Sequence, residues 1–186
     1  MFASHAASAL RSGKRLVPRF LRRLGRSSDG AALIEFAILG PAFLALLVAI
    51  LQTGVVFLFQ QTLQTATTQT ARLIMTGQAQ TQNISSGTFL NDVCNAAGSI
   101  FTCANLSANI QTFSSFSGVQ MNSPVNNGTF TAPSNYNLGG PGDIVLVQVF
   151  YQLPVMTAPL GFNMATTSNG NALIVATAVF RNEPYQ

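Results

Sequence analysis

The sequence predicts an α+β protein in which a long N-terminal transmembrane α-helix continues into an exported head with a small antiparallel β-sheet. Three observations support this fold class. Residues 36–59 are apolar and carry no charge, which is typical of a membrane span. Apolar and small residues then keep helical spacing as far as Gly77. Two later segments, 143–153 and 172–180, are rich in β-branched and aromatic residues, as strands are.

The charge of the chain is concentrated in its N-terminal part. The 186 residues are 48% hydrophobic and 8% charged, whereas roughly 25% of the residues of a typical soluble domain are charged. The net charge is +4, but seven of the nine Lys and Arg residues precede Gly30. From Ala31 onward the chain has two Arg residues and four acids. Because this larger part has no basic surface, the sequence predicts no nucleic-acid partner.

Residues 1–30 are predicted to be a basic leader on the cytoplasmic side of a membrane. Basic residues flank a membrane helix on its cytoplasmic side, so the chain from Gln60 onward is expected outside. Within the leader, residues 1–28 either form a short basic helix on the membrane surface or have no fixed structure. His5, the single histidine of the chain, lies in this leader and is assigned no role.

Residues 31–77 are predicted to form one long helix whose transmembrane segment covers about 36–59. These 24 uncharged residues would reach roughly 36 Å, at about 1.5 Å each, enough to cross a hydrocarbon core of about 30 Å. Fifteen of them are Leu, Ile, Val or Phe and outweigh the polar Gln52 and Thr53. A cleaved secretory signal is the alternative, disfavoured because the run is long and no small-x-small cleavage site lies beyond it at a good distance.

Gly40 and Pro41 lie inside this predicted span. Pro41 has no N–H to donate to the carbonyl of Ala37, so a kink or a loosened turn is expected there. Membrane helices tolerate such residues, and the pair is therefore compatible with the span.

The helical spacing continues beyond the span. Residues three and four positions apart are apolar or small: Val56, Phe59, Leu63, Ala66, Thr70, Leu73 and Gly77. This narrow seam indicates a helix of about 45 residues, roughly 65–70 Å long, that ends near Gly77. Its outer half is either a membrane-proximal stalk or a helix shared between a globular head and a filament core.

Residues 78–186 are predicted to form the exported α+β head. A polar link over 78–87 leads to a short helix capped by Thr88 and stopped by Gly98. The expected elements, in chain order, are this helix over Phe89–Ala97, a strand within Asn105–Phe116, a hairpin turn at Asn126-Asn127-Gly128, and strands over Asp143–Leu153 and 172–180. Three strands and a helix laid on the long helix give an antiparallel sheet.

The two cysteines, Cys94 and Cys103, are separated by eight residues and lie well beyond the span. Two thiols without a neighbouring histidine make a poor metal site. If the span exports the chain beyond it, the thiols lie in an oxidising compartment and are expected to pair. Closing so short a loop would stabilise the head by roughly 2.5–3 kcal/mol in the chain-entropy model.

No arrangement of residues predicts catalysis, a cofactor or a metal site. The only histidine lies in the leader, which leaves no Ser-His-Asp or Cys-His arrangement. Asp92, Asp143 and Glu183 are scattered along the chain, and nothing in the sequence brings two of them together. The glycine-rich residues 139–142 precede a predicted strand, whereas phosphate-binding loops come after one.

A short motif surrounds the start of the long helix. Gly30 is followed five residues on by Glu35 and then Phe36, and Pro41 comes six residues after the acid. Further motifs are Ala71-Arg72, the two cysteines ahead of Ile110-Gln-Thr-Phe-Ser-Ser-Phe116, Pro141-Gly-Asp143, and Arg181-Asn-Glu-Pro-Tyr185. Over about residues 22–185 the sequence resembles the type IV pilins and, more closely, the TadE-like pseudopilins, minor pilins of bacterial tight-adherence (Flp) pilus systems.

The resemblance implies a processing site and an assembly site. In such families a membrane aspartyl peptidase, the prepilin peptidase, cleaves after the glycine, which here places the processing site at Gly30–Ala31. Glu35 and Phe36 would serve assembly and registry, with Glu35 pairing with the new amine of Ala31 in a neighbouring subunit. The 30-residue leader, with Asp29 before the glycine, differs from the usual short leader with a basic residue at that place.

Glu35 also has an interpretation that needs no partner. A carboxylate costs up to roughly 2.5–3.5 kcal/mol at mid-bilayer and less near the interface, so acids in a span are functional candidates. The alternative is that Glu35 only extends to the lipid headgroups beside Arg26.

The sequence supports three hypotheses about function. The first is a non-catalytic minor pilin or pilus-assembly component in the bacterial inner membrane, with its head in the periplasm or in a cell-surface pilus. Its partners would be the membrane, other pilins or pseudopilins, the inner-membrane platform of the pilus and the prepilin peptidase. The second is a single-pass, membrane-anchored exported binding or adhesin module that joins no filament. The third, a periplasmic enzyme behind an uncleaved signal, is disfavoured by the missing acid/base residues.

Overall fold

The computed structural model describes residues 28–156 and 161–185, so the predictions made for residues 1–27, His5 included, lie outside the described residues. The chain divides into two units, Met1–Leu44 and Ala45–Gln186. The described part of the first unit is the beginning of a helix. The second unit holds the rest of that helix and the whole head.

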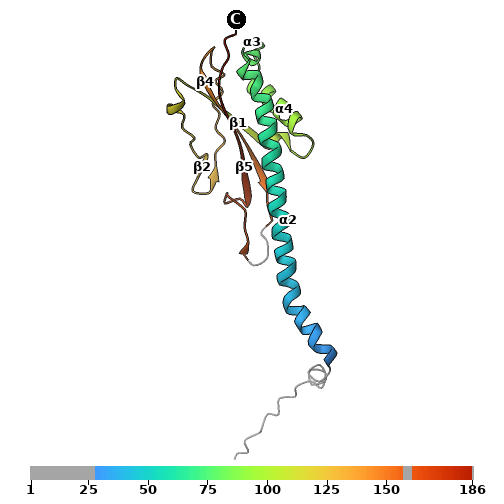
Figure 1. Cartoon of the computed structure of the whole chain (residues 1–186). Helices are drawn as coiled ribbons and strands as arrows, with labels where there is room; N and C mark the ends of the chain where they lie inside the picture. The colour runs from blue at the N-terminus through green and yellow to red at the C-terminus, as the bar shows by residue number, and fades with distance from the viewer. Residues whose placement is uncertain (1–27, 157–160, 186) are drawn as a thin grey trace, which may run out of the picture. The chain divides into compact units, whose positions relative to one another are not determined.

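The longest element is the helix α2, which runs from Ser28 to Met75 (Figure 1). Its 48 residues correspond to about 72 Å of helix at about 1.5 Å per residue. The prediction of a long N-terminal helix is confirmed. The helix ends two residues before Gly77, which has a φ of 78° and so takes the left-handed conformation that terminates helices. Pro41 lies inside α2 with helix on both sides, and the predicted kink stays a prediction.

Threonine is frequent in the outer part of α2 without disrupting it. Hydroxyl groups there donate to the carbonyl four residues earlier, at Thr53, Thr62, Thr65, Thr68 and Thr70. This local bond satisfies the hydroxyl inside the helix. The β-branched polar residues therefore remain compatible with a continuous helix.

Three antiparallel strands form the sheet of the head: β1 (Leu106–Phe113), β4 (Ile144–Pro154) and β5 (Asn171–Arg181), in the order β1-β4-β5. The predicted antiparallel sheet is confirmed. A separate two-stranded ribbon pairs β2 (Val125–Asn126) with β3 (Thr129–Phe130). Its turn residues, Asn127 and Gly128, both have positive φ, as the tight hairpin predicted from the Asn-Gly pair requires.

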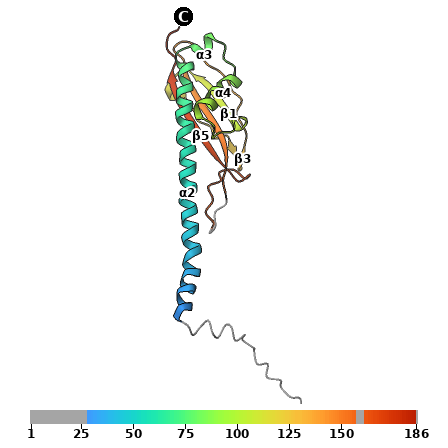
Figure 2. The ribbon, with the colours of Figure 1, turned by 90° about the vertical axis from the view of Figure 1, so that its right-hand side faces the viewer.

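The central strand β4 is buried on both faces, which explains why its sequence is apolar almost throughout. Its odd-numbered residues join the core formed with α2 and with α4 (Ser86–Ala97). On the other face, the ring of Phe150 lies 5.9 Å from that of Phe130 in the β2–β3 ribbon. Figure 2 shows α2 running alongside the strands of the sheet.

The predicted seam of α2 packs against the head of the same chain. Leu63, Ala66 and Thr70 are buried as expected. Leu73, like Val56 and Phe59, is partly buried and packs against the same core, whereas Ile74, which the predicted seam did not include, is fully buried. The reason is that a second column, containing Thr67 and Ala71, is buried beside the first, because a sheet contacts a wider stripe of a helix than a single partner helix does.

The short helices of the head differ from the prediction in their details. α4 begins earlier than expected, and its N-cap is Ser85, whose hydroxyl accepts the N–H of Thr88. The prediction of Thr88 as the cap was wrong by one turn because both residues are good capping types and Ser85 comes first. Gly98 ends the helix as predicted, with a φ of 84°. The polar link contains the short helix α3 (Gln78–Thr81), which was not expected.

Candidate functional site

The residues implicated in processing and assembly lie in the first turns of α2. Gly30, Glu35 and Phe36 are all helical, and Glu35 and Phe36 are exposed. Residue 31 lies one turn before Glu35 because four positions separate them. A Cβ placed on Gly40 would lie 3.5 Å from the Phe36 ring, an ordinary contact. The ring of Phe36 therefore lies next to the backbone of the glycine one turn on.

The first half of α2 exposes apolar side chains on all its sides. The large residues exposed in this part are Leu33, Ile34, Phe36, Ile38, Leu39, Phe43, Leu44, Leu46, Leu47, Ile50 and Leu51. Phe36, for example, is 75% exposed. Apolar surface costs about 25 cal/mol per Å² in water, so a surface this large indicates a lipid or protein environment. Among the described residues, α2 is the one helix long and apolar enough to cross a membrane.

The polar Gln52 and Thr53 have partners in the head. The side-chain amide of Gln52 donates to the carbonyl oxygen of Met156 at 2.8 Å. The hydroxyl of Thr53 donates to Ala49 O and lies 3.7 Å from the sulfur of Met164. These contacts explain two polar residues that are otherwise unfavourable within an apolar run, and they locate the point where the head first meets α2.

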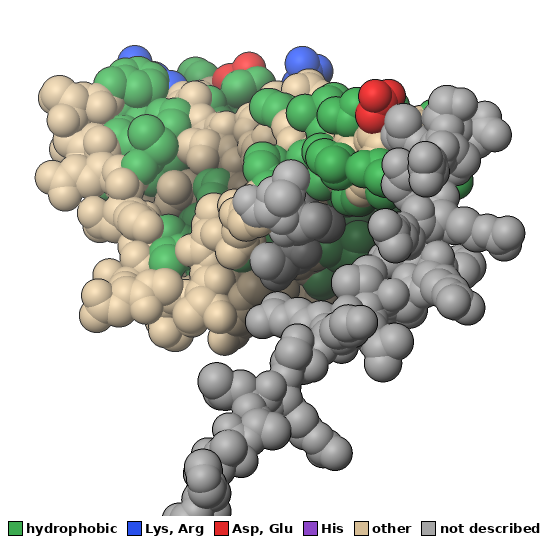
Figure 3. Space-filling model, turned by 90° about the horizontal axis from the view of Figure 1, so that it is seen from below, with side chains coloured by type: hydrophobic (Ala, Val, Ile, Leu, Met, Phe, Trp, Pro, Cys, Tyr) green, Lys and Arg blue, Asp and Glu red, His purple; other side chains and the backbone are tan. Residues whose placement is uncertain are grey.

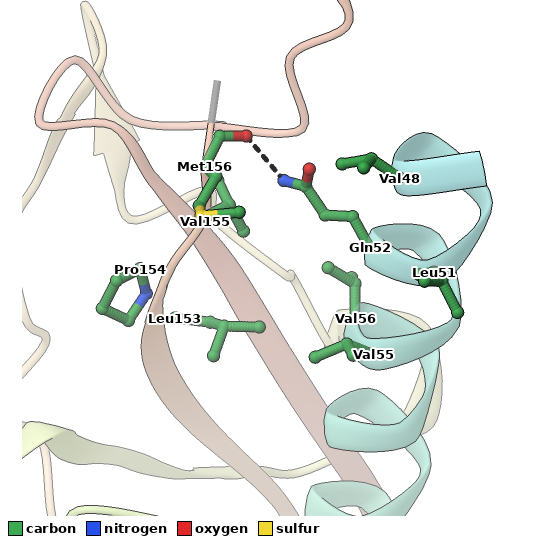
Figure 4. A pocket seen from close by; sticks show the side chains of 9 residues that line it. All are labelled: Val48, Leu51, Gln52, Val55, Val56, Leu153, Pro154, Val155 and Met156. Atoms are coloured by element: carbon green, nitrogen blue, oxygen red, sulfur yellow. Dashed lines mark hydrogen bonds between the residues drawn. The ribbon is translucent and has the colours of Figure 1, made fainter. Parts of the chain in front are cut away.

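An apolar cavity of about 360 Å³ lies at this meeting point (Figure 4). On the helix side it is lined by Val48, Leu51, Gln52, Val55 and Val56, and on the head side by Leu153, Pro154, Val155 and Met156. The amide of Gln52 is its main polar group. The cavity has the composition of a site for a hydrocarbon chain rather than for a polar substrate.

Farther along α2, two glutamines close the free edge of the sheet. β5 is an edge strand, with unpaired backbone groups on the side away from β4. Gln60 donates to the carbonyl of Val175 at 2.7 Å. Gln64 donates to the carbonyl of Thr177 at 2.9 Å and accepts its N–H at 3.1 Å, in place of a neighbouring strand. The sequence analysis missed this role, although the spacing of four between the two glutamines was a usable signal.

The C-terminal motif Arg181-Asn-Glu-Pro-Tyr185 meets the Pro141-Gly-Asp143 turn at the far end of the head. Arg181 Nε donates to the carbonyl of Gly142 at 2.9 Å. The amide of Asn182 donates to the carbonyls of Leu138 and Gly140, and Tyr185 OH donates to that of Gly139. All these bonds go to backbone oxygens. The two motifs therefore hold loops together, and their geometry is that of a structural joint.

The same joint fixes the outer end of α2. The N–H of Glu183 donates to the carbonyl of Met75, the last residue of the helix, at 2.8 Å. The Tyr185 ring covers Gly77 so closely that a Cβ on this glycine would overlap with it. Gly77 therefore combines a left-handed backbone with a position that only a residue without a side chain can fill.

Cys94 and Cys103 form a disulfide, as the sequence predicted. The bridge links the last turn of α4 to the 3-10 turn η1 (Cys103–Asn105), which leads into β1. It closes a loop whose Phe101 packs between helix and sheet. The ring of Phe101 lies 5.0 Å from that of Phe59 in α2 and 4.8 Å from that of Tyr151 in β4.

The acids of the head have local contacts. Asp143 accepts the N–H of Gly140 and stabilises its own turn. Burial raises the pKa of Tyr136, and the negative charge of Asp92 raises it further. Tyr136 donates to the carbonyl of Ile84 at 2.8 Å. Within residues 28–156 and 161–185, no group of three His, Cys, Asp or Glu residues is placed to hold a metal ion.

In the described part of the chain, a long helix with an exposed apolar half continues into a small α+β head, an arrangement that fits a single-pass membrane anchor. The family model described as TadE-like protein matches residues 30–72. This part of the long helix is therefore similar to the TadE-like proteins. The resemblance found in the sequence is confirmed for this helix, and the head motifs lie outside the matched residues. Comparison with curated proteins and with solved structures gives no match.

Proposed function

We propose that this protein is a non-catalytic minor pilin or pilus-assembly component of a tight-adherence (Flp) pilus. α2 anchors it in the inner membrane, and the head lies in the periplasm. One observation carries the proposal: the TadE-like match coincides with a helix that has Gly30 and Glu35 at its start and an exposed apolar surface after them. The disulfide supports the periplasmic location, because such bonds persist in oxidising compartments.

The proposed processing step is cleavage between Gly30 and Ala31 by the prepilin peptidase. Intact mass of the membrane-extracted protein, co-expressed with the cognate peptidase, is expected to lack residues 1–30. Gly30→Val should block the cut, because a branched side chain replaces the glycine at the scissile bond. Gly40→Val, the same exchange ten residues later, is the matched control and should be cut normally. An uncut wild-type chain in the presence of active peptidase contradicts this step.

The proposed role of Glu35 is to pair with the Ala31 amine of a neighbouring subunit as helices bundle. A carboxylate among apolar side chains such as Ile34 and Phe36 gains most from a partner charge, because little water is present to solvate it. Glu35→Gln keeps the shape and removes the charge, so piliation is expected to fall at least about tenfold, equivalent to about 1.4 kcal/mol. Glu35→Asp retains the charge and should retain part of the function. Unchanged piliation in Glu35→Gln contradicts the pairing role.

The competing function, an anchored exported binding or adhesin module, uses the helix only as an anchor. Replacing residues 32–51 by an unrelated apolar span of equal length distinguishes the adhesin function from the proposed pilus function. The proposed pilus component loses its incorporation into filaments or its ability to promote them, since the other pilins and the inner-membrane platform contact this helix. An adhesin keeps its surface binding after the exchange, and that result would favour the competing function.

A further inference from the structure

The head has two ends that differ in charge. α2 and β5 run side by side in the same direction, since Gln60 contacts Val175, Gln64 contacts Thr177, and Met75 contacts Glu183. We call the end of the head beside Gln52 the proximal end; its described residues are 153–156 and 161–164. The opposite, distal end holds the joint between the C-terminal motif and the turn that ends at Asp143.

The charged residues of the head gather toward its distal end. Asp143 and Arg181 belong to the distal joint, Glu183 contacts the last residue of α2, and Arg72 lies in the last turn of that helix. The fifth charged residue is Asp92, whose charge raises the pKa of Tyr136. The hydroxyl of Tyr136 in turn donates to the carbonyl of Ile84, just after α3. In contrast, the sequence has no charged residue over 36–71 or over 144–180. The proximal end is therefore uncharged.

The proximal end also exposes large apolar side chains. Met156 is 72% exposed and Phe162 is 38% exposed. At the same level of α2, Leu51, Val55, Phe57 and Leu58 are exposed as well. In the view of the whole molecule from below, most of the coloured side chains are uncharged, and the few charged groups visible lie along one edge (Figure 3). An apolar, uncharged surface of this kind is rare on a soluble head without a partner.

The length of α2 places this end at a membrane. The 20 residues from Ala32 to Leu51 reach about 30 Å as a helix, the thickness of a hydrocarbon core. The outer boundary of the hydrocarbon core then lies at Gln52, which is hydrogen-bonded to Met156. If the span is instead 36–59, the boundary lies about 10 Å farther out, at about 1.5 Å per residue. In both registers Met156 lies at or below the boundary between hydrocarbon and headgroups.

We infer that the proximal end of the head is a second membrane-contacting surface, which inserts Met156 and Phe162 into the outer face of the phospholipid bilayer. The inference rests on the proposed span of α2. The cavity at Gln52 then opens toward lipid, which matches its apolar lining. Two contacts, the span and the proximal end, fix the depth and the tilt of the head before assembly. A subunit that enters a filament has to withdraw this surface from lipid.

The chain contains no tryptophan, so single Trp substitutions report position without background. The full chain is reconstituted in phosphatidylcholine–phosphatidylglycerol vesicles that carry a quencher near the headgroup or deep in the acyl chain. Phe162→Trp is expected to be quenched more strongly by the shallow quencher than by the deep one. Phe116→Trp is the matched control; this exposed phenylalanine comes after the distal end of β1 and should be quenched by neither. Phe43→Trp, inside the span, should be quenched most by the deep quencher.

The three probes separate the failure of this inference from failure of the proposed anchor. If Phe43→Trp is quenched and Phe162→Trp is not, the span stands and the inference is wrong. If Phe43→Trp is not quenched by the deep label either, the span itself is wrong. A blue-shifted but unquenched Phe162→Trp at low protein-to-lipid ratio would mean that a second copy of the chain covers the surface, which also overturns the inference.

A charge placed on the surface provides an independent test. Met156→Glu in the Phe162→Trp background is expected to reduce shallow quenching at least threefold, because a carboxylate resists transfer from water. Val179→Glu is the control, since Val179 is an exposed apolar residue of β5 beside Arg72. It should leave the quenching unchanged. Equal quenching in the two variants and the parent would contradict insertion of the proximal end.

Discussion

The two halves of α2 are one continuous helix with opposite surroundings. From residue 32 to residue 51 the helix is apolar except for Glu35, and it exposes its Leu, Ile and Phe side chains. From residue 59 to residue 75 apolar and small residues occupy one stripe, which is buried against the head, and Gln, Thr and Arg72 occupy most of the rest. Beyond residue 58 the apolar surface of the outer half is thus covered by its own chain, whereas the apolar surface before that residue needs lipid or other subunits.

Because of this difference, residues of the same type have different roles in the two halves. Leu63 is fully buried in the core, and Leu46 is 60% exposed on the same helix. The first holds the fold of the head, because its removal would leave a cavity. The second is available to an environment outside the chain. The stability of the head and the assembly of the anchor should therefore respond to separate sets of substitutions.

The largest expected effect tests this separation directly. Leu63→Ala should lower the free energy of unfolding of the head by about 2–5 kcal/mol, as buried Leu→Ala exchanges do. Leu46→Ala, the same exchange in the inner half, should change it by less than about 0.5 kcal/mol. Denaturant unfolding of the detergent-solubilised protein, followed by near-UV circular dichroism of the tyrosines, measures both. Equal losses in the two variants would contradict the division of α2 into two halves.

The second expected effect concerns the disulfide, which holds the Phe101 loop between α2 and the sheet. The double variant Cys94→Ser, Cys103→Ser should lose roughly 2.5–3 kcal/mol of stability, by the loop-closure entropy of so short a loop. Phe101 should then become more accessible to solvent, because the bridge no longer restrains its loop. The comparison is made with the oxidised wild type, in the same unfolding measurement. A wild type that reacts with a thiol label at both cysteines before reduction would show that the bridge does not form.

Most of this architecture could be predicted because each half of α2 has its own pattern. Uninterrupted apolarity indicated the span, and spacing of three and four indicated the packed stripe. The roles of Gln60 and Gln64 could not be read in this way. A polar residue beside an apolar stripe is usually solvated, and only the position of β5 along the helix shows that these amides pair with a strand edge.

The site was predicted unevenly for a similar reason. Gly30 and Glu35 were singled out by a local motif, which needs no knowledge of the fold. The contact of Gln52 with Met156 joins residues 104 positions apart, and no local pattern specifies such a contact. The sequence likewise indicated the C-terminal motif without indicating its partner. The structure shows that the motif holds the 139–142 turn and the end of α2.

A smaller effect is expected where the outer half of α2 closes the sheet. Gln64→Ala should cost about 1–3 kcal/mol, since it leaves the N–H and the carbonyl of Thr177 without their partner in this edge. Gln61→Ala, at an exposed glutamine of the same helix, should cost less than about 0.5 kcal/mol. Hydrogen exchange at the Thr177 amide provides the local readout and should be faster only in Gln64→Ala. Unaltered exchange there would mean that the amide pairing contributes nothing to the edge.

The smallest effect is a pH dependence that belongs to the head alone. The pKa of Tyr136 is raised above its usual 10.0 by burial first and by the charge of Asp92 second. Folding therefore favours the neutral phenol. This contribution to stability is complete below about pH 10 and is lost as the pH rises through the higher folded-state pKa. Tyr136→Phe removes both the titration and the hydrogen bond to Ile84, at a cost of about 1 kcal/mol at neutral pH.

The difference in unfolding free energy between wild type and Tyr136→Phe should accordingly shrink above pH 10, because only the wild type must keep a phenol neutral. Taking the difference cancels every contribution that the two proteins share. Asp92→Asn should move the change to lower pH, since it removes the second cause of the shift. The inner half of α2 has no part in this titration, so replacing residues 32–51 by an unrelated span should leave the profile as it is. A profile that changes with the span would couple the two halves and contradict their independence.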